Sequence, residues 1–328
     1  MSATSPLTIR TSAPHERGAV LDLLDEWISR EFFARYFEHD PAFRDDLCFV
    51  AADGDRIVST LQVFGKAVRL GGTIVRVGGI GNVYTTAAYR ERGVASLLLT
   101  RAIDAMDALG FDLSLLFAVR LAFYGRHGWE SCPRRFGFID PAVVAPSDRY
   151  RLEPFVAERD LAEVMAVYDA YSGALTGTTV RDHSYWLGQL RYAGNLAEDF
   201  LVARDGERIV AYARATSLYD FYVLMEHGYL PGHETALVDL VCRLHGTEGR
   251  ALPGTLTQLA TESRILDALA ARGLPVRIVD DAFWMWRVIS PTRLAHKLDV
   301  SVAEIEQDDF FPRLLPPDGS VFWLSDRF

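Results

Sequence analysis

Cysteine is scarce in this sequence, and no group of residues has the spacing of a metal site. The 328 residues include three cysteines, Cys48, Cys132 and Cys242, which lie far apart along the chain. The eight histidines are scattered, without a His-x-x-x-His pair or a cluster of cysteine and histidine. Metal centres need such local groups of ligands, whereas a few isolated cysteines are typical of buried thiols. We therefore expect buried thiols and no bound metal.

The sequence also lacks long apolar runs. No stretch reaches the about 20 apolar residues that a membrane-spanning helix needs. Residues 1–6 contain no apolar core of the kind found in signal peptides. These absences argue against a membrane protein and against secretion, and they predict a cytoplasmic location without a membrane partner.

Positive charge is in deficit. Lysine and arginine number 34 against 44 aspartate and glutamate residues, which gives a formal net charge of −10 at pH 7. Proteins that bind nucleic acids need basic patches that neutralise phosphate, so we expect no nucleic-acid partner. An acidic protein is compatible with a cationic amine as substrate.

Residues 83–99 are the most informative segment that is present. A short strand-like run from Val83 to Thr85 leads into a loop with the spacing Arg-x-x-Gly-x-Ala, and an apolar helix follows at once. Such a loop turns its backbone N–H groups inward, and the start of the helix adds free donors and a partial positive charge. Gly93 lets the backbone approach a ligand closely. The segment predicts a site for a diphosphate with a long organic arm. The alternative is an ordinary strand–turn–helix with a solvated loop.

A second motif follows further along the chain. Tyr124, Gly128 and Trp129 come after a strand-like run at 113–119 and have the spacing Tyr-x-x-x-Gly-aromatic. Taken alone, this pattern is also typical of a short helix that ends at a glycine and packs its aromatic side chains. The order and separation of the two motifs favour a common site.

Together, the two motifs resemble the GNAT superfamily of N-acetyltransferases. The resemblance implies that acetyl-CoA is the co-substrate, that the main chain of Val83, Tyr84 and Thr85 binds its pantetheine arm, and that the loop binds its pyrophosphate. The loop residues so implied are Arg90, Glu91, Arg92, Gly93, Val94, Ala95 and Ser96. It also implies that Tyr124 lies beside the sulfur of CoA and protonates the departing thiolate. A covalent route through Cys132, which follows Tyr124 closely in the sequence, is an alternative.

The chain contains an internal repeat. Residues 49–58 and 201–210 are identical at seven of ten positions, and both have the pattern strand, Asp-Gly turn, strand. The segments before the two hairpins also correspond, which favours duplication of a whole domain in a chain that is long enough for two. We therefore expect an α/β fold with mixed sheets, made of two tandem GNAT folds and a short C-terminal tail. The expected parts are a catalytic domain at 1–145, a degenerate domain at 146–290 and a tail at 291–328.

The first copy has the element order of the GNAT fold. We expect strands at 47–52, 56–70, 73–85 and 111–119, and a helix at about 91–109. The apolar residues of this helix, Val94, Leu98, Ala102, Met106 and Leu109, have helical spacing.

The second copy has lost both motifs. Residues 231–236 stand where the loop belongs, and Leu266 and Asp267 stand where the tyrosine belongs. An active first unit followed by a degenerate one resembles the Eis-like (enhanced intracellular survival) acetyltransferases, as do the runs at 124–129 and 285–288. This resemblance implies a homo-oligomer.

The tail departs from that family. Eis proteins carry a sterol-carrier-like third domain, whereas 38 residues follow Ser290 here. We expect the tail to dock on the GNAT units, with a helix at 291–298 and a strand-like end at 321–328. In Eis enzymes the C-terminal carboxylate is thought to act as general base, and the resemblance implies this role for the α-carboxylate of Phe328. The alternative is that the end of the chain only packs on the second unit.

These features predict an N-acetyltransferase that acts on a primary amine of a small molecule or of lysine, by direct attack in a ternary complex. The first helical pair lines the acceptor pocket in GNAT folds, which implies Trp27, Glu31, Phe32 and Tyr36 here. An amphipathic helix with ordinary core aromatics explains each of them equally well. Two other functions stay open: an acyltransferase that uses a longer acyl-CoA, and a non-catalytic acyl-CoA sensor or assembly module.

Overall fold

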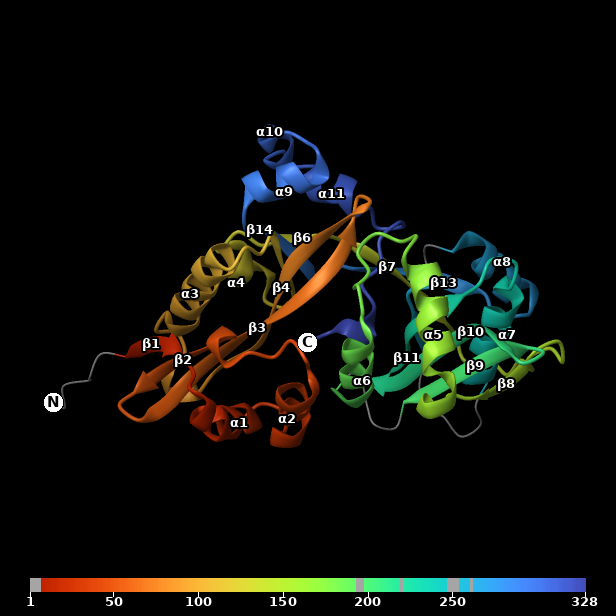
Figure 1. The fold of residues 1–328 in the computed structure, drawn as a ribbon, viewed down its shortest axis with the longest axis horizontal. Helices are drawn as coiled ribbons and strands as arrows, with labels where there is room; N and C mark the ends of the chain where they lie inside the picture. Colours follow the sequence, from red (N-terminus) through yellow and green to blue (C-terminus); the bar gives the residue numbers. More distant parts are fainter. Residues whose placement is uncertain (1–6, 193–197, 219–220, 247–253, 260–261) are drawn as a thin grey trace.

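The computed structural model describes residues 7–192, 198–218, 221–246, 254–259 and 262–328. Within these ranges the chain forms two mixed β-sheets of seven strands each, flanked by helices (Figure 1). This confirms the predicted α/β fold class with mixed sheets. No helix in the described ranges has the length and apolar character that crossing a bilayer requires.

The first sheet is built mainly from the N-terminal part of the chain. Its strands, in spatial order, are β1 (Thr8–Thr11), β2 (Cys48–Asp53), β3 (Arg56–Leu70), β4 (Thr73–Thr85), β5 (Leu113–Phe117), β14 (Trp284–Val288) and β6 (Glu130–Ser131). Neighbours pair antiparallel except β4 and β5, which run parallel. The expected strands of the first copy are therefore confirmed.

The second sheet repeats this plan. Its strands, in spatial order, are β13 (Val276–Asp281), β7 (Arg134–Ile139), β12 (Thr255–Thr257), β11 (Phe221–Tyr229), β10 (Arg208–Leu218), β9 (Asp199–Asp205) and β8 (Arg151–Pro154). Here the parallel pair is β11 and β12. Gly54 and Gly206 turn the two repeated hairpins with positive φ angles of 59° and 61°, a conformation that glycine adopts without strain. The internal repeat of the sequence is thus a repeat of structure.

The two sheets exchange one strand each. β14, from the end of the second copy, lies between β5 and β6 of the first sheet, and β7, from the end of the first copy, lies between β12 and β13 of the second. Trp284 and Trp286 of β14 are fully buried in the first unit. The predicted domain bounds at residues 145 and 290 remain predictions, because each sheet contains one strand from the other copy.

Helices cover both faces of the sheets. Their bounds are α1 (Arg17–Asp25), α2 (Arg30–His39), α3 (Val94–Ala108), α4 (Leu121–Gly125), α5 (Ala157–Ser172), α6 (His183–Tyr192), α7 (Glu234–His245), α8 (Ser263–Ala271), α9 (Pro291–Leu298), α10 (Val302–Ile305) and α11 (Phe310–Leu314). The apolar stripe of α3 is confirmed, because it packs in one cluster with Phe49 and Leu61 of the first sheet. α1 and α2 pack in a separate cluster with Val50 of β2 and Phe64 of β3. Side chains alternate between the two faces of a sheet along each strand, so Phe49 and Val50 belong to clusters on opposite faces.

The tail docks on both units. α9 is formed as predicted and packs with β4, and the last residues run to a point between β3 and α6, where the chain end is marked in Figure 1. The predicted strand at 321–328 is wrong, because this segment forms only a short 3-10 turn at Leu324–Asp326. Its backbone carbonyls bond to side chains instead of a neighbouring strand: Gln258 donates to Phe322 O at 3.0 Å and Gln189 to Ser325 O at 2.8 Å.

Candidate active site

The site begins where β4 leaves β5. The parallel pairing joins Val77, Gly78 and Gly79 of β4 to residues 113–115 and then stops, whereas β4 continues beside β3 as far as Thr85. The register with β3 shifts near Gln62, and Asn82 takes a positive φ of 53°, as in a β-bulge. Among the described residues, β5 therefore leaves the main chain of residues 80–85 without a strand partner on that side.

A loop with two left-handed residues follows β4. Glu91 has a φ of 62° and Gly93 a φ of 76°, and Gly93 is the N-cap residue of α3. The first N–H groups of α3, at Val94, Ala95 and Ser96, have no acceptor within the helix, and a glycine cap offers no side chain to satisfy them. Successive inward N–H groups and the helix dipole make such a turn suited to bind an anion.

Arg90 joins this loop to the end of β4. Its Nε donates to Thr85 O at 2.9 Å, and its Nη2 donates to the hydroxyl of Tyr84 at 3.1 Å. Tyr84 in turn donates to Glu26 Oε2 at 3.1 Å. The predicted residues Tyr84, Thr85 and Arg90 are thus in direct contact, and the structure adds Glu26, which the sequence motifs do not include.

Tyr124 lies on α4 and packs against the same apolar cluster as Val83 and Val94. Burial raises the pKa of Tyr124 to about 12, so its hydroxyl keeps its proton throughout the neutral range. His127, in the same motif, contacts the loop: its Nε2 lies 3.0 Å from Ser96 Oγ at the start of α3. The motif at 124–129 and the loop at 90–96 therefore form one region.

Phe328 of the C-terminal tail contacts β4. Its ring lies directly over Gly79, and its main-chain carbonyl carbon lies 3.3 Å from the position that a Cβ at Gly81 would take. The ring also stacks on Phe64 with centroids 5.6 Å apart. Phe328 therefore sits where β4 and β5 separate.

The predicted acceptor residues are spread along a row of aromatic rings. Trp27 is parallel to Tyr84 with ring centroids 6.4 Å apart. Phe32 contacts Tyr36, and Tyr36 contacts Phe64, the residue that stacks on Phe328. Glu31 is exposed and accepts a hydrogen bond from Arg35 at 3.0 Å. Trp27 is thus connected to Tyr84, near the loop, and Tyr36 is connected through Phe64 to Phe328.

Cys132 is unsuited to a covalent route. Its side chain is buried, and burial is the main cause that raises the pKa of its thiol to about 12. The thiolate is the nucleophilic form of cysteine, so this thiol is unreactive near neutral pH.

The second unit has an equivalent opening, but the tail fills it. β11 pairs with β12 only from Tyr222 to Leu224, whereas it continues beside β10 as far as Tyr229. The Trp323 ring lies 4.8 Å from the ring of His227 on β11, and Ser325 donates to Glu226 beside it. An acyl-CoA could not enter here without displacing these side chains.

Comparison with known proteins agrees with this geometry. Residues 8–132 match the family model for the acetyltransferase (GNAT) domain. An uncharacterized N-acetyltransferase of Streptomyces coelicolor is 28% identical over 230 residues, which are 66% of this chain and 52% of the relative. The chain thus spans about half the length of that protein.

Two solved structures share the fold over most of the chain. A probable N-acyltransferase of Enterococcus faecalis superposes with a TM-score of 0.69 at 15% identity, over 89% of this chain and 75% of that one. Eis1 of Mycobacterium abscessus gives a TM-score of 0.57 at 15% identity, over 87% and 74%. The predicted resemblance to Eis is thereby confirmed for the fold. The family match, together with the separated strands and the loop before α3, assigns residues 8–132 to the acetyltransferase (GNAT) domain family.

Proposed function

We propose that the protein transfers an acetyl group from acetyl-CoA to a primary amine of a small molecule or of lysine. One observation carries the proposal: the main-chain carbonyl carbon of Phe328, which is the carboxyl carbon in a protein that ends there, lies against Gly81, at the point where β4 separates from β5. The proposal thus combines a proton acceptor beside Gly81, the main chain of β4 that β5 leaves unpaired, and the turn that follows β4 and is suited to bind an anion.

The chain fits the CoA part of this proposal. The turn from Arg90 to Ser96 offers N–H donors for the pyrophosphate. The free edge of Val83, Tyr84 and Thr85 offers main-chain groups for the pantetheine arm. When bound there, acetyl-CoA supplies the acetyl thioester.

Two proton transfers are assigned to named residues. In a protein that ends at Phe328, the α-carboxylate accepts a proton from the ammonium form of the substrate, through a water molecule. The amine then forms the C–N bond to the acetyl carbon as the C–S bond breaks. Tyr124 donates its proton to the departing thiolate, and the second proton lost by the nitrogen finally replaces it. The raised pKa of Tyr124 supports this role, because the hydroxyl is protonated when the thiolate forms.

The row of aromatic rings suits an amine on a partly apolar body. Trp27 is exposed and stacks on Tyr84, so it offers a ring face to a cation, and Glu26, which accepts from the Tyr84 hydroxyl, adds negative charge there. Phe32 and Tyr36 extend the apolar surface toward Phe328. A cytoplasmic location and a homo-oligomer remain predictions.

The direct test is release of free thiol from acetyl-CoA with aminoglycosides, polyamines, lysine peptides and arylamines, beside a control without acceptor. We expect a clear increase with at least one class. CoA binding without turnover of any acceptor, and without slow hydrolysis, would contradict transferase activity and support the sensor alternative. Faster turnover of longer acyl-CoA would contradict acetyl-CoA as donor. Absence of CoA binding by calorimetry would contradict the assignment of the loop.

A further inference from the structure

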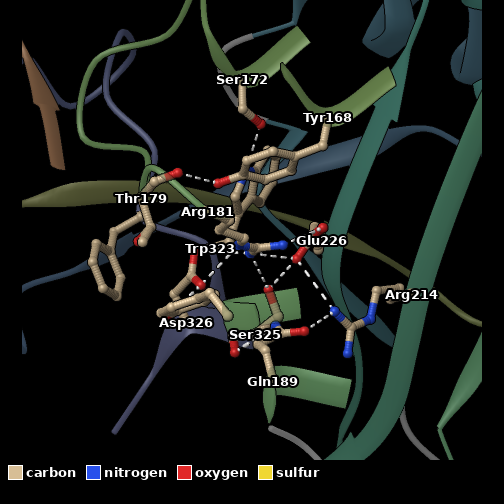
Figure 2. A network of polar contacts seen from close by, with 12 residues as sticks. Tyr168, Ser172, Thr179, Arg181, Gln189, Arg214, Glu226, Trp323, Ser325 and Asp326 are labelled. Atoms are coloured by element: carbon tan, nitrogen blue, oxygen red, sulfur yellow. Dashed lines mark hydrogen bonds and ion pairs between the residues drawn. The ribbon is translucent and has the colours of Figure 1, made fainter. Parts of the chain in front are cut away.

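A buried ionic cluster holds the tail against the second unit. Arg181, Glu226 and Asp326 have fully buried side chains (Figure 2). The Arg181 guanidinium donates to both oxygens of Glu226, at 3.0 and 2.7 Å, and to both oxygens of Asp326, at 3.0 and 2.8 Å. Such two-pronged pairs fix orientation as well as distance. The guanidinium therefore sets the position of Asp326 relative to β11.

The neighbours of Asp326 are held as well. Trp323 Nε1 donates to Ser172 Oγ at 3.0 Å, and Arg181 Nη2 donates to Ser325 Oγ at 3.1 Å (Figure 2). Asp326 also accepts from the hydroxyl of Tyr185 at 2.9 Å. Every one of these partners lies in the second unit, so the tail is attached there before it reaches β4.

The same cluster is also hydrogen-bonded to the first sheet. Lys66 of β3 is buried and donates to the Tyr185 hydroxyl at 2.7 Å. Val180, next to Arg181, donates its N–H to Ala67 O of β3 at 2.7 Å. Lys66 is two residues from Phe64, so both side chains lie on one face of the strand, and Phe64 stacks on Phe328. The cluster and the site thus share one strand.

Only one residue separates Asp326 from Phe328. Because consecutive Cα atoms are about 3.8 Å apart, a fixed Asp326 leaves Phe328 little freedom. We propose that Arg181 and Asp326 are positioning residues, which hold Phe328 on Gly79 and Gly81 so that its carboxyl group stays at the opening between β4 and β5. The catalytic part of this inference rests on the function proposed above for Phe328.

The alternative is that the cluster only stabilises the fold. A buried ion pair is by itself weak evidence for stability, because removing charges from water opposes their attraction. Apolar residues could fill the same space, but they would not set the angle of the tail as a two-pronged pair does. The test must therefore separate the position of Phe328 from the stability of the protein.

We would compare Asp326→Asn with Asp160→Asn in the full chain. Asp160 is also buried and is bound by Arg204 and Arg159, in the second unit and within contacts that do not include the tail. Each variant is assayed for kcat and KM, for CoA affinity, and for release of Phe328 by carboxypeptidase A in the native state. We expect Asp326→Asn to lower kcat about tenfold to a hundredfold, to leave CoA affinity unchanged and to speed release of Phe328. Asp160→Asn should change neither kcat nor release.

The outcomes separate the two proposals. Equal behaviour of the two variants in kcat and in release would overturn the positioning role. Protected Phe328 in the parent protein, freed by Asp326→Asn but without any thiol release, would contradict the proposed function and support the positioning role. If Asp326→Asn does not fold, Ser325→Ala serves, because it removes the hydroxyl that accepts from Arg181 and donates to Glu226 and should give a smaller change in the same direction. Asp326→Glu should recover part of the lost kcat.

Discussion

The ring of Phe328 lies on the main chain of Gly79, so close that the Cβ of any other residue at position 79 would overlap it. Gly81 faces the main-chain carbonyl carbon of Phe328 and the ring of Phe64, with contacts of 3.3 and 2.9 Å to a Cβ placed there. The two glycines therefore form the surface on which Phe328 rests.

Gly79→Ala should displace Phe328 from the site. We expect kcat to fall about tenfold or more, since small misplacements of reacting groups cost that much, while CoA affinity is retained. Gly65→Ala on β3 is the matched control, because its Cβ would make an ordinary contact of 3.7 Å with the Phe111 ring. Equal activity of both variants, measured by thiol release, would contradict a role for this contact.

One glycine added after Phe328 should also impair turnover. The addition moves the terminal carboxylate by one residue while the Phe328 ring can stay in place. We expect a loss of kcat with little change in thermal stability, and a glycine added before residue 1 should have no effect. Unchanged kcat in the extended protein would mean that the tail has a structural role only.

Gly93→Glu should abolish CoA binding. The side chain would bring negative charge to the turn that we assign to the pyrophosphate, and the left-handed φ of 76° adds strain of roughly 1–2 kcal/mol. Gly206→Glu is the control for strain, since Gly206 has a φ of 61° and open space around it in the second unit. Calorimetry should show CoA binding in the control and none in Gly93→Glu. Equal affinity would refute the assignment of the loop.

Tyr124→Phe should lower kcat about a hundredfold, the lower end of what a positioned general acid contributes. Because the pKa of Tyr124 is raised to about 12, the pH profile of the parent enzyme should show no fall from tyrosine ionisation at moderately alkaline pH. Tyr150→Phe, which removes a buried hydroxyl bonded to Thr235 in the second unit, should retain activity. Full activity of Tyr124→Phe would exclude it as the acid.

Acid should destabilise the protein through two adjacent residues of β11. Burial lowers the pKa of His227 from 6.5 to about 3. Burial alone would raise the pKa of Glu226, but the charges of Arg181 and Arg214 outweigh it and lower this pKa from 4.5 to about 2. At pH values between its ordinary pKa and its lowered pKa, each residue binds more protons in the unfolded chain than in the native protein. The free energy of unfolding therefore falls as pH decreases through these ranges.

The contribution of His227 to stability can be measured separately at pH values above the range in which Glu226 titrates. The Tyr171 hydroxyl donates to Glu262 and accepts from His227 Nε2, and a glutamine amide can make the same donation. His227→Gln should therefore flatten the pH dependence of the free energy of unfolding between 6.5 and 4.5, measured by urea denaturation at a series of pH values. A slope identical to that of the parent protein would contradict this origin.

Local patterns predicted most of the first unit. The turn before α3 could be located because a left-handed glycine and an apolar helical stripe are encoded within a few residues. Cys132 could be identified as buried, but its unreactivity depends on surroundings that only the folded chain supplies. The run of Gly78, Gly79 and Gly81 in one strand was a usable indication of close approach, yet what approaches it could not be predicted from the strand alone.

Contacts between distant segments could not be predicted. β14 pairs with β5 although more than half of the chain separates them, and neither strand has a pattern that specifies its partner. Asp326 is an ordinary acidic residue in sequence, and only the fold brings it to Arg181. The strand expected at 321–328 failed for the same reason, since its hydrogen-bond partners are side chains of the other unit.

The exchange of β7 and β14 has a consequence for how the protein is made. Translation in cells proceeds at about 5–20 residues per second, so β5 waits on the order of ten seconds before β14 has been synthesised. Until then the edge of β5 in the first sheet is open to pairing with other nascent chains. The exchange also links the two copies in evolution: the second copy supplies an interior strand of the first sheet, so it cannot be deleted without opening that sheet.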